Sequence, residues 1–370
     1  VYATGGNMAV ENGTFEAHGN GTCVSMAIVN AGGTAEGESE EALRIAHGAF
    51  YSQVGDTISV AAGTMRVTGG SFYKNATSVA KDATSDADGT AGANNAIINI
   101  SGGTLEVTGT ADSRITFDLT GSYMYGIESA AESRVGEAAT LADAGRVTVT
   151  NADFTFNGGS NAGAHTTNYG ISSSAGTIDV AGCIFVLPDQ NSRGISVENG
   201  TVTVGGATKD AFPDGSTNLT QDTDRYSYFY VDSNVNSYGV YAGRDDASTE
   251  NITVNMDAAQ LFVGQKRVNG AKNEGGAGVY LNAGDNSQIN LGEVYVLAAG
   301  NSVSGIVAES GSISQTDSAR ENYTNKLVVI TGATYSGYES GKTCFLRSID
   351  SYTNKFVAQN PLDVTTTSSS

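Results

Sequence analysis

Apolar and polar residues alternate one by one along much of the chain, and the alternation is interrupted by a recurring Gly-Thr pair. Residues 195–206 read ISVENGTVTVGG, and residues 8–19 read MAVENGTFEAHG. In the first stretch, Ile195 and Val197 precede the glycine and Val202 follows it. A period of two is typical of a β-strand with one buried face. The pattern therefore predicts two short strands joined by a glycine corner.

The same thirteen-residue frame recurs along the chain with the Gly-Thr pair at a fixed place. The five glycines are Gly13, Gly63, Gly103, Gly176 and Gly200. A third apolar run follows several of the frames, as at 152–158 and 182–189. Repetition in phase favours units that stack on copies of themselves over hairpins that vary independently. Glycine suits the corner because it adopts φ > 0 without strain. We expect an all-β fold, a right-handed parallel β-helix (three-strand β-solenoid) with loop excursions.

The repeat runs through nearly the whole chain, so we expect one continuous β-helix domain over residues 1–364 and a Ser/Thr-rich tail at 365–370. Irregular spacing between the frames predicts loop excursions at 31–50, 74–94, 128–145, 207–223 and 312–325. The first of these contains ESEEALRIAH. We expect this stretch to be helical, since Ser39 can cap a helix and acidic residues fill its first turn.

A second motif, glycine followed by Ile or Val, opens many of the predicted rungs. It occurs in MYGIES (124–129), NYGISS (168–173), SRGISV (192–197), SYGVYA (237–242), GAGVYL (276–281) and VSGIVA (303–308). With these motifs the chain resembles the right-handed parallel β-helices of bacterial secreted proteins, especially autotransporter passengers and filamentous-haemagglutinin-like surface adhesins. The resemblance covers most of residues 5–360 and is one of pattern and composition. It implies an extracellular protein, on the cell surface or secreted, and it transfers no functional residue.

Charge and cysteine content limit which classes of partner the protein is expected to bind. The net charge is −20, but only 16% of the 370 residues are charged. The acidic residues are therefore spread thinly along the chain and favour solubility. No Lys/Arg cluster occurs, which argues against binding to nucleic acid. No run of eighteen apolar residues, the length needed to span a membrane, occurs either. Cys23, Cys183 and Cys344 follow no metal-ligand spacing, so we expect small buried apolar residues, with one disulfide left open. We expect no cofactor.

Candidate chemistry is sparse, so we expect the protein not to be an enzyme. The fold is shared with pectin-lyase-like polysaccharide enzymes, and Asp245 and Asp246 form the only Asp-Asp pair. Adjacent residues of a strand point to opposite faces, so we interpret this pair as a solvated turn. The stretch TSDADGT (84–90) matches half of a calcium loop, but Thr84 and Asn95 stand where ligands are needed, and no metal site is predicted.

The most distinctive local feature is DRYSYFYVD at 224–232. In a strand, Tyr226, Tyr228 and Tyr230 share one face, whereas Phe229 and Val231 share the other and suit the core better. The three tyrosines are therefore expected to point outward as a ligand-binding row for a sugar or a protein. The alternative is that a neighbouring loop, such as 207–223, covers them as a small satellite core.

The repeat predicts a structural protein that associates head to tail into filaments, and the resemblance implies a surface location with an adhesive role towards a glycan or a host-surface receptor. Met8 and Val10 already occupy ladder positions, strand-like sequence continues through 344–350 and 354–364, and no capping helix is evident. Uncapped end rungs offer unpaired backbone groups to another copy. One alternative is that the chain is a fragment of a longer protein. The other is a polysaccharide-binding or polysaccharide-degrading β-helix protein.

Overall fold

A computed structural model of the chain describes residues 2–3, 8–17, 29–31, 41–53, 56–60, 63–75, 96–101, 103–121, 124–130, 145–157, 167–188, 191–207, 223–224, 226–231, 236–244, 250–263, 276–298, 303–315, 327–330, 334–336, 346–347, 349–350, 355–356 and 364–367. These residues form β-strands, turns and bends, and no helix occurs among them. The chain divides into two compact units, Val1–Ile178 and Asp179–Ser370, and each is described by itself. The prediction of one continuous domain over 1–364 stays a prediction.

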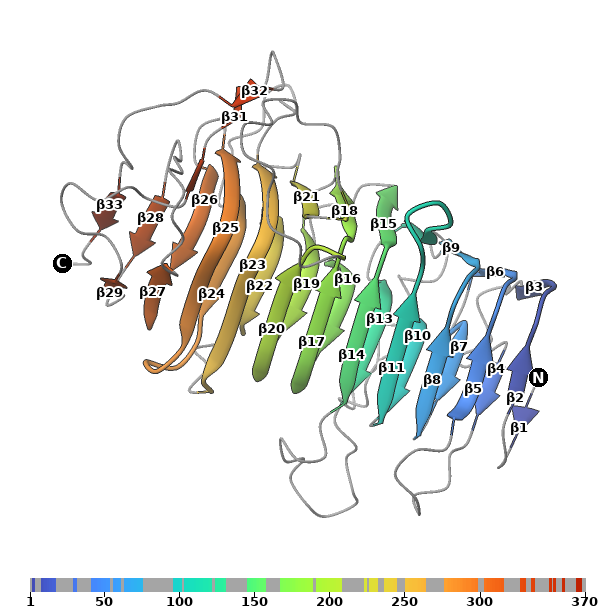
Figure 1. Ribbon diagram of the computed structural model, residues 1–370. Helices are drawn as coiled ribbons and strands as arrows, with labels where there is room; N and C mark the ends of the chain where they lie inside the picture. Colours follow the sequence, from blue (N-terminus) through green and yellow to red (C-terminus); the bar gives the residue numbers. More distant parts are fainter. Residues whose placement is uncertain are drawn as a thin grey trace. The chain divides into compact units, whose positions relative to one another are not determined.

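The first unit consists of rungs of two or three short strands that repeat in parallel (Figure 1). One sheet contains β1 (Tyr2–Ala3), β4 (Val29–Ala31), β7 (Ile58–Val60), β10 (Ala96–Ser101), β13 (Tyr125–Ala130) and β16 (Asn168–Ser173). The other contains β2 (Met8–Val10), β3 (Thr14–Ala17), β5 (Glu41–Ile45), β6 (Ala49–Ser52), β8 (Thr64–Val67), β9 (Ser71–Asn75), β11 (Thr104–Thr108), β12 (Ile115–Thr120), β14 (Arg146–Thr150), β15 (Ala152–Asn157) and β17 (Gly176–Ala181).

The second unit repeats the same arrangement. Its strands of the first kind of sheet are β19 (Ser192–Val197), β22 (Tyr238–Gly243), β24 (Gly276–Asn282), β26 (Val303–Ala308), β28 (Leu327–Ile330) and β33 (Val364–Thr367). Those of the second kind are β18 (Ile184–Leu187), β20 (Gly200–Gly205), β21 (Ser227–Val231), β23 (Ile252–Val263), β25 (Gln288–Ala298), β27 (Ser312–Gln315), β29 (Thr334–Ser336) and β30 (Leu346–Arg347). β31 (Ile349–Asp350) and β32 (Lys355–Phe356) form an antiparallel pair. The predicted parallel β-helix is confirmed.

In-register ladders of apolar side chains fill the interior of each unit. In the first unit, Ile58, Ile98, Ile127 and Ile171 pair from rung to rung, and all are fully buried. In the second unit, the equivalent ladder is Ile195, Val240, Val279 and Ile306. An aromatic ladder, Phe50, Phe72, Phe117 and Phe154, stacks with ring centroids 4.9, 5.1 and 4.7 Å apart. Each rung therefore packs mainly on the rungs next to it.

The glycine corners have the backbone conformation that the repeat predicts. The φ angles at Gly13, Gly63, Gly103, Gly176 and Gly200 are 149°, 89°, 81°, 120° and 119°. The corners also stack, since the amide of Thr104 donates to the carbonyl of Gly63 over 2.9 Å. Glycine is thus required at these positions for its conformation.

The glycines of the second motif have a different role. They lie where the backbones of neighbouring rungs approach closely. A Cβ atom on Gly126 would lie 2.6 Å from the carbonyl oxygen of Gly170, and one on Gly239 would lie 2.5 Å from that of Gly278. Inner aromatic rings also pack against this column, with Phe154 next to Gly126. These glycines are required because no side chain fits.

The predicted helix in ESEEALRIAH is wrong for the residues that the structure describes. Glu41–Ile45 form strand β5, in which Leu43 pairs with Met8 and with Met65. Leu43 and Ile45 are fully buried, so their period-two spacing, combined with pairing on both sides, overrides the helix propensity of Glu, Ala and Leu. Residues 41–50 are accordingly part of the coil and not of the excursion predicted at 31–50, while Ser39 lies outside the described residues.

The other predicted excursions fall mostly on residues 76–95, 131–144, 208–222 and 316–326, which lie outside the described residues. The first residues of three predicted excursions belong instead to β9, β13 and β27, so these residues are part of the coil. β33 ends at Thr367, inside the segment predicted to be a tail.

Candidate functional site

The predicted tyrosine row lies at β21, where it is largely covered. Phe229 and Val231 are fully buried in the interior, as expected. The exposure expected for the other face is wrong for Tyr226 and Tyr228, which are only 5% and 2% exposed, while Tyr230 is partly buried. The alternative of a satellite core describes these tyrosines better. Ligand binding by the row stays a prediction.

Register sets which residues lie beside these tyrosines in the sheet. Tyr228 pairs with Ile184 on one side and Gln260 on the other, and Tyr230 pairs with Phe262. The rings of Tyr230 and Phe262 stack with centroids 4.9 Å apart. A stacked ring presents its edge outward and its face to its neighbour, so it offers little flat surface to a sugar. The row therefore stabilises the rungs through packing.

A second aromatic cluster, which the sequence reasoning missed, lies on the outer face of β22 and β24. Tyr238, Tyr241 and Tyr280 pack together, and the guanidinium carbon of Arg193 lies 3.6 Å from the ring centroid of Tyr241. Burial, followed by a hydrogen bond to Glu309, raises the pKa of Tyr280 well above its ordinary value. The signal in the sequence is a tyrosine two residues after the rung glycine, as in YGVY and GVY.

The cluster around Tyr241 is nearly closed. Arg193 is 9% exposed, Tyr238 is 9% exposed and Tyr241 is 3% exposed. A cation over an aromatic face contributes about 0.5–2 kcal/mol, more when it is desolvated. Arg193 already occupies the face of Tyr241, so the arrangement accounts for rigidity of these rungs and leaves little ring surface for an incoming cation.

The first unit contains a buried polar cluster at the end of β6 and β9. Lys74 points into the interior and is fully buried, and its Nζ donates to Oγ of Ser52 over 3.2 Å. The hydroxyls of Ser52 and Thr57 lie 2.5 Å apart. Burial lowers the pKa of Lys74 to about 7, although the nearby charge of Asp56 opposes that shift.

Two carboxyl groups flank this cluster. Asp56 accepts hydrogen bonds from the amide of Ala96 over 3.0 Å and from Nδ2 of Asn99 over 2.8 Å. Burial, and then the charge of Asp56, raises the pKa of Glu128 to about 7. Asp56 therefore lies within electrostatic reach of both Lys74 and Glu128.

A hydroxyl beside an amine of lowered pKa is the arrangement of a serine–lysine nucleophile pair. In this protein, however, Ser52 and Lys74 are both fully buried. A catalytic nucleophile has to reach its substrate. The pair is therefore better explained as a buried polar cluster whose members hydrogen-bond to one another.

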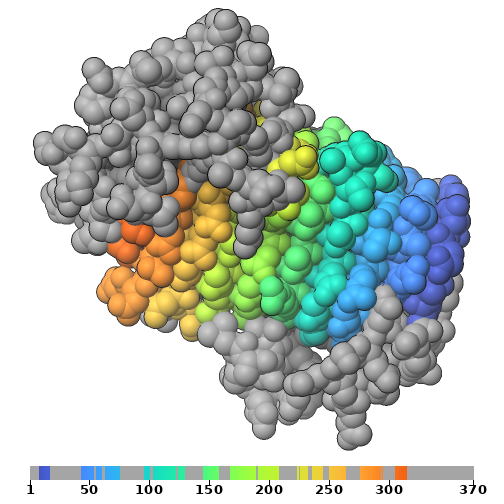
Figure 2. All heavy atoms as spheres, viewed as in Figure 1, coloured from blue at the N-terminus to red at the C-terminus, as the bar shows by residue number. Residues whose placement is uncertain are grey.

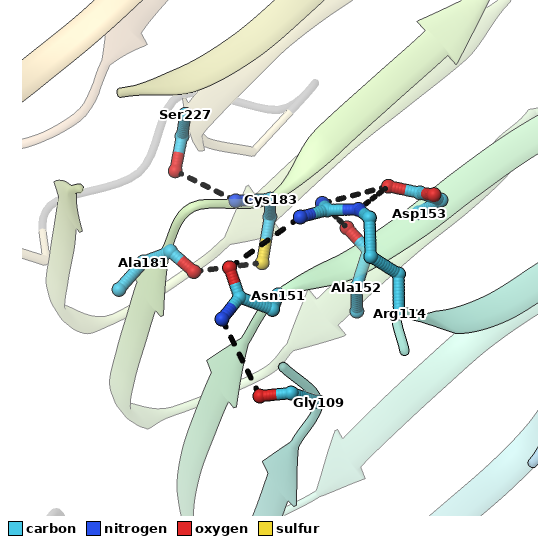
Figure 3. A network of polar contacts seen from close by, with 8 residues as sticks. All are labelled: Gly109, Arg114, Asn151, Ala152, Asp153, Ala181, Cys183 and Ser227. Carbon is cyan, nitrogen blue, oxygen red and sulfur yellow. Dashed lines mark hydrogen bonds and ion pairs between the residues drawn. The ribbon is translucent and has the colours of Figure 1, made fainter. Parts of the chain in front are cut away.

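A third polar network holds the bend between β14 and β15 (Figure 3). Arg114 forms an ion pair with Asp153 at 2.7 Å and donates to the carbonyl of Ala152 over 3.2 Å. Asn151 adopts φ of 52° and donates to the carbonyl of Gly109 over 3.3 Å. Asparagine tolerates this left-handed conformation better than other non-glycine residues, so the network fixes a corner.

Cys183 behaves as the sequence predicts. It is fully buried, its amide donates to Oγ of Ser227 over 3.1 Å, and its thiol lies 3.5 Å from the carbonyl of Ala181 (Figure 3). Cys23, Cys344, the Asp245–Asp246 pair and residues 84–90 lie outside the described residues, so their roles stay predictions.

In the part of the chain that the structure describes, no three His, Cys, Asp or Glu side chains converge on a point that could hold a metal ion. No helix in that same part could cross a membrane. Comparison with known proteins gives no match to a family model, to a curated protein or to a solved structure.

Proposed function

We propose that the protein is an extracellular structural protein of a cell surface, with an adhesive role and without catalytic activity. The observation that carries the proposal is the in-register ladder inside each unit, typified by the stack from Phe50 to Phe154. Such a coil needs its inward positions for packing and leaves its outward positions free to vary. This division suits a scaffold that displays a surface.

The polar clusters support the non-catalytic part of the proposal. Lys74 and Ser52 are enclosed, Arg193 is stacked on Tyr241, and Arg114 is committed to a corner. Each of these groups has a packing or hydrogen-bonding role that accounts for its presence. A chemical role is therefore not needed to explain them.

Self-association end to end is part of the same proposal. Parallel rungs pair through backbone groups and matched apolar ladders, as Val254 does with Val202 and Ile289. A rung on another copy can offer the same edge and the same ladder. Head-to-tail pairing of this kind would extend the scaffold into a filament.

Adhesion and catalysis can be separated in one experiment. Beads coated with the purified chain are tested for retention on immobilised polysaccharides and on host-type cell surfaces, while the length of soluble polysaccharide chains is followed in parallel. Retention without chain shortening is the expected result. Chain shortening that stops in Asp245→Asn would instead establish the polysaccharide-degrading alternative.

Location can be tested on intact cells that produce the protein. An antibody raised against the purified chain is expected to label unbroken cells or the culture medium. Labelling that requires cell lysis would contradict the extracellular part of the proposal.

A further inference from the structure

The outer face of the second unit carries a regular array of uncharged polar side chains over β20, β23, β25 and β27. Two columns run across these strands in register. They consist of Thr201, Thr253, Gln288 and Ser312, and of Thr203, Asn255, Asn290 and Ser314. The residues between the columns point inward, since Val202, Val254, Ile289 and Ile313 are fully buried. We call these two columns the polar face.

The polar face forms part of the molecular surface. Gln288 is exposed and the other seven side chains are partly exposed. In Figure 2 the atoms coloured from yellow-green to orange, which include those of β20, β23 and β25, form part of the visible surface. Glu250 and Asp257, both exposed, lie just before and just after the two columns on β23. An uncharged strip is thus bordered by acids.

The corresponding outer positions of the first unit differ in charge. There, Arg66 forms an ion pair with Glu106 at 2.7 Å, and Arg146 occupies the position next along the column from Thr104. Charged side chains are therefore compatible with this face of the coil. Their replacement by Thr, Asn, Gln and Ser in the second unit is a property of that surface and not of the fold.

Hydrogen bonds between rungs hold the polar face in place. Nδ2 of Asn290 donates to Oδ1 of Asn255 over 2.9 Å, and Oγ of Ser314 donates to Oδ1 of Asn290 over 2.6 Å. Side chains that are already ordered lose little conformational entropy when a ligand binds. The columns repeat at the spacing of neighbouring strands, about 4.8 Å. The array suits a ligand that is itself long and repetitive, because many weak contacts then add up.

Charge and polarity decide what kind of ligand fits. A polyanion is disfavoured by Glu250, Asp257 and a net charge of −20. A second copy would bring the same acids against this border. An apolar partner would bury hydroxyl and amide groups without hydrogen bonds, which costs about 1–3 kcal/mol for each group. A neutral, hydroxyl-rich polymer can donate to and accept from the same side chains.

We propose that the polar face binds a neutral polysaccharide. This inference rests on the adhesive role proposed above and identifies the surface and the ligand class that would serve it. Hydroxyl groups of successive sugars would replace water on Thr253, Asn255 and Gln288, with further contacts along the columns.

The test is co-sedimentation of the full chain with insoluble neutral polysaccharides (cellulose, chitin and a β-1,3-glucan), with calcium alginate gel as the acidic counterpart. Retention on at least one neutral polymer and none on alginate is expected. Thr253→Arg places a long cation in the middle of the polar face and should weaken retention about tenfold, the equivalent of about 1.4 kcal/mol. Thr148→Arg is the matched control, since it adds the same side chain to an outward column beside Glu106 in the first unit.

Melting temperature is measured for each variant to separate binding from folding. Gln288→Arg, at the exposed position, provides a second disruption if Thr253→Arg destabilises the chain. Retention that both variants leave unchanged, retention that Thr148→Arg weakens equally, or binding to alginate alone would overturn the inference. So would a lack of retention on every neutral polymer. Beads that still adhere to host-type surfaces in that case would leave the adhesive role intact, whereas beads that adhere to nothing would also remove the proposed function.

Discussion

Gly239 illustrates how a single residue type is imposed by the approach of two backbones. A Cβ atom at this position would lie 2.5 Å from the carbonyl oxygen of Gly278 and 3.1 Å from the ring of Phe229. The neighbouring backbone and the buried ring have little room to move away from an added methyl group. We therefore predict that Gly239→Ala lowers the free energy of unfolding by about 1–3 kcal/mol. Urea denaturation followed by circular dichroism would measure the change.

Gly205 is the matched control for this substitution, since no heavy atom would lie within 4 Å of an added Cβ. Gly205→Ala should not destabilise the protein and could raise the free energy of unfolding by up to about 1 kcal/mol, because alanine restricts the unfolded chain. Equal losses of unfolding free energy in the two variants would show that backbone conformation, and not the lack of space, explains the glycine at position 239.

Lys74 and Glu128 predict an unusual dependence of stability on pH. The pKa of Lys74 falls from 10.5 to about 7 on folding, so the unfolded chain binds the proton more tightly and stability rises between pH 7 and 10.5. The pKa of Glu128 rises from 4.5 to about 7, so the folded chain binds the proton more tightly and stability falls between pH 4.5 and 7. Together they predict a minimum in the free energy of unfolding near pH 7.

Two substitutions separate the contributions of Lys74 and Glu128 to this dependence of stability on pH. Lys74→Met should flatten the rise above pH 7, and Glu128→Gln should flatten the fall below it, as measured by urea denaturation across pH 5–10. A profile that neither substitution alters would contradict the coupling of these groups to folding.

At the scale of the strands, the stack of Phe50, Phe72, Phe117 and Phe154 is the clearest test of the rung-by-rung core. Phe117 is fully buried, with rings on both sides at 5.1 and 4.7 Å. We predict that Phe117→Ala lowers the free energy of unfolding by about 3–5 kcal/mol. Thr116→Ala on the outward side of the same strand should change it by no more than about 0.5 kcal/mol.

Hydrogen exchange would show where the loss from Phe117→Ala is felt. Amides in β9, β12 and β15 should lose protection most, because these strands pair directly with each other. Uniform loss across the described strands of the first unit would indicate one cooperative core in place of a chain of neighbouring rungs.

The strands show how far sequence reasoning reaches in this fold. The Gly-Thr corners were predictable because conformation at Gly63 or Gly200 is a local property. β5 was not, since Glu41–Ile45 is built from good helix formers and becomes a strand only through pairing with β2 and β8. The long segments between the Gly-Thr frames also interrupt the repeat, so the succession of rungs could not be derived from the sequence.

The candidate site was harder to predict for a related reason. Outward orientation of Tyr228 followed from period-two alternation, but its neighbours in the sheet, Ile184 and Gln260, are far away in the sequence. The polar face likewise appears only when β20, β23, β25 and β27 are aligned, because each strand alone contributes two ordinary polar residues. Cross-strand register is the information that the repeat pattern alone lacks.

At the scale of the whole molecule, net charge determines how the proposed adhesion and self-association should depend on salt. The chain carries 39 acidic and 19 basic residues, and the acids are spread along it. Copies of the protein therefore repel one another over a distance set by the ionic strength, whereas a neutral polymer feels no such repulsion. Adhesion to a neutral polysaccharide should accordingly depend little on salt, and self-association should depend on it strongly.

This contrast gives a prediction for filament formation. The screening length is about 30 Å at 0.01 M salt and about 3 Å at 1 M, so raising the salt concentration over that range removes most of the repulsion between copies with a net charge of −20. Apolar ladders and backbone edges can then pair end to end. We expect light scattering to show growth in particle mass with rising NaCl at fixed protein concentration, and electron microscopy to show thin unbranched particles. Particles that stay monomeric at every salt and protein concentration would exclude the filament and leave a scaffold that acts as single molecules.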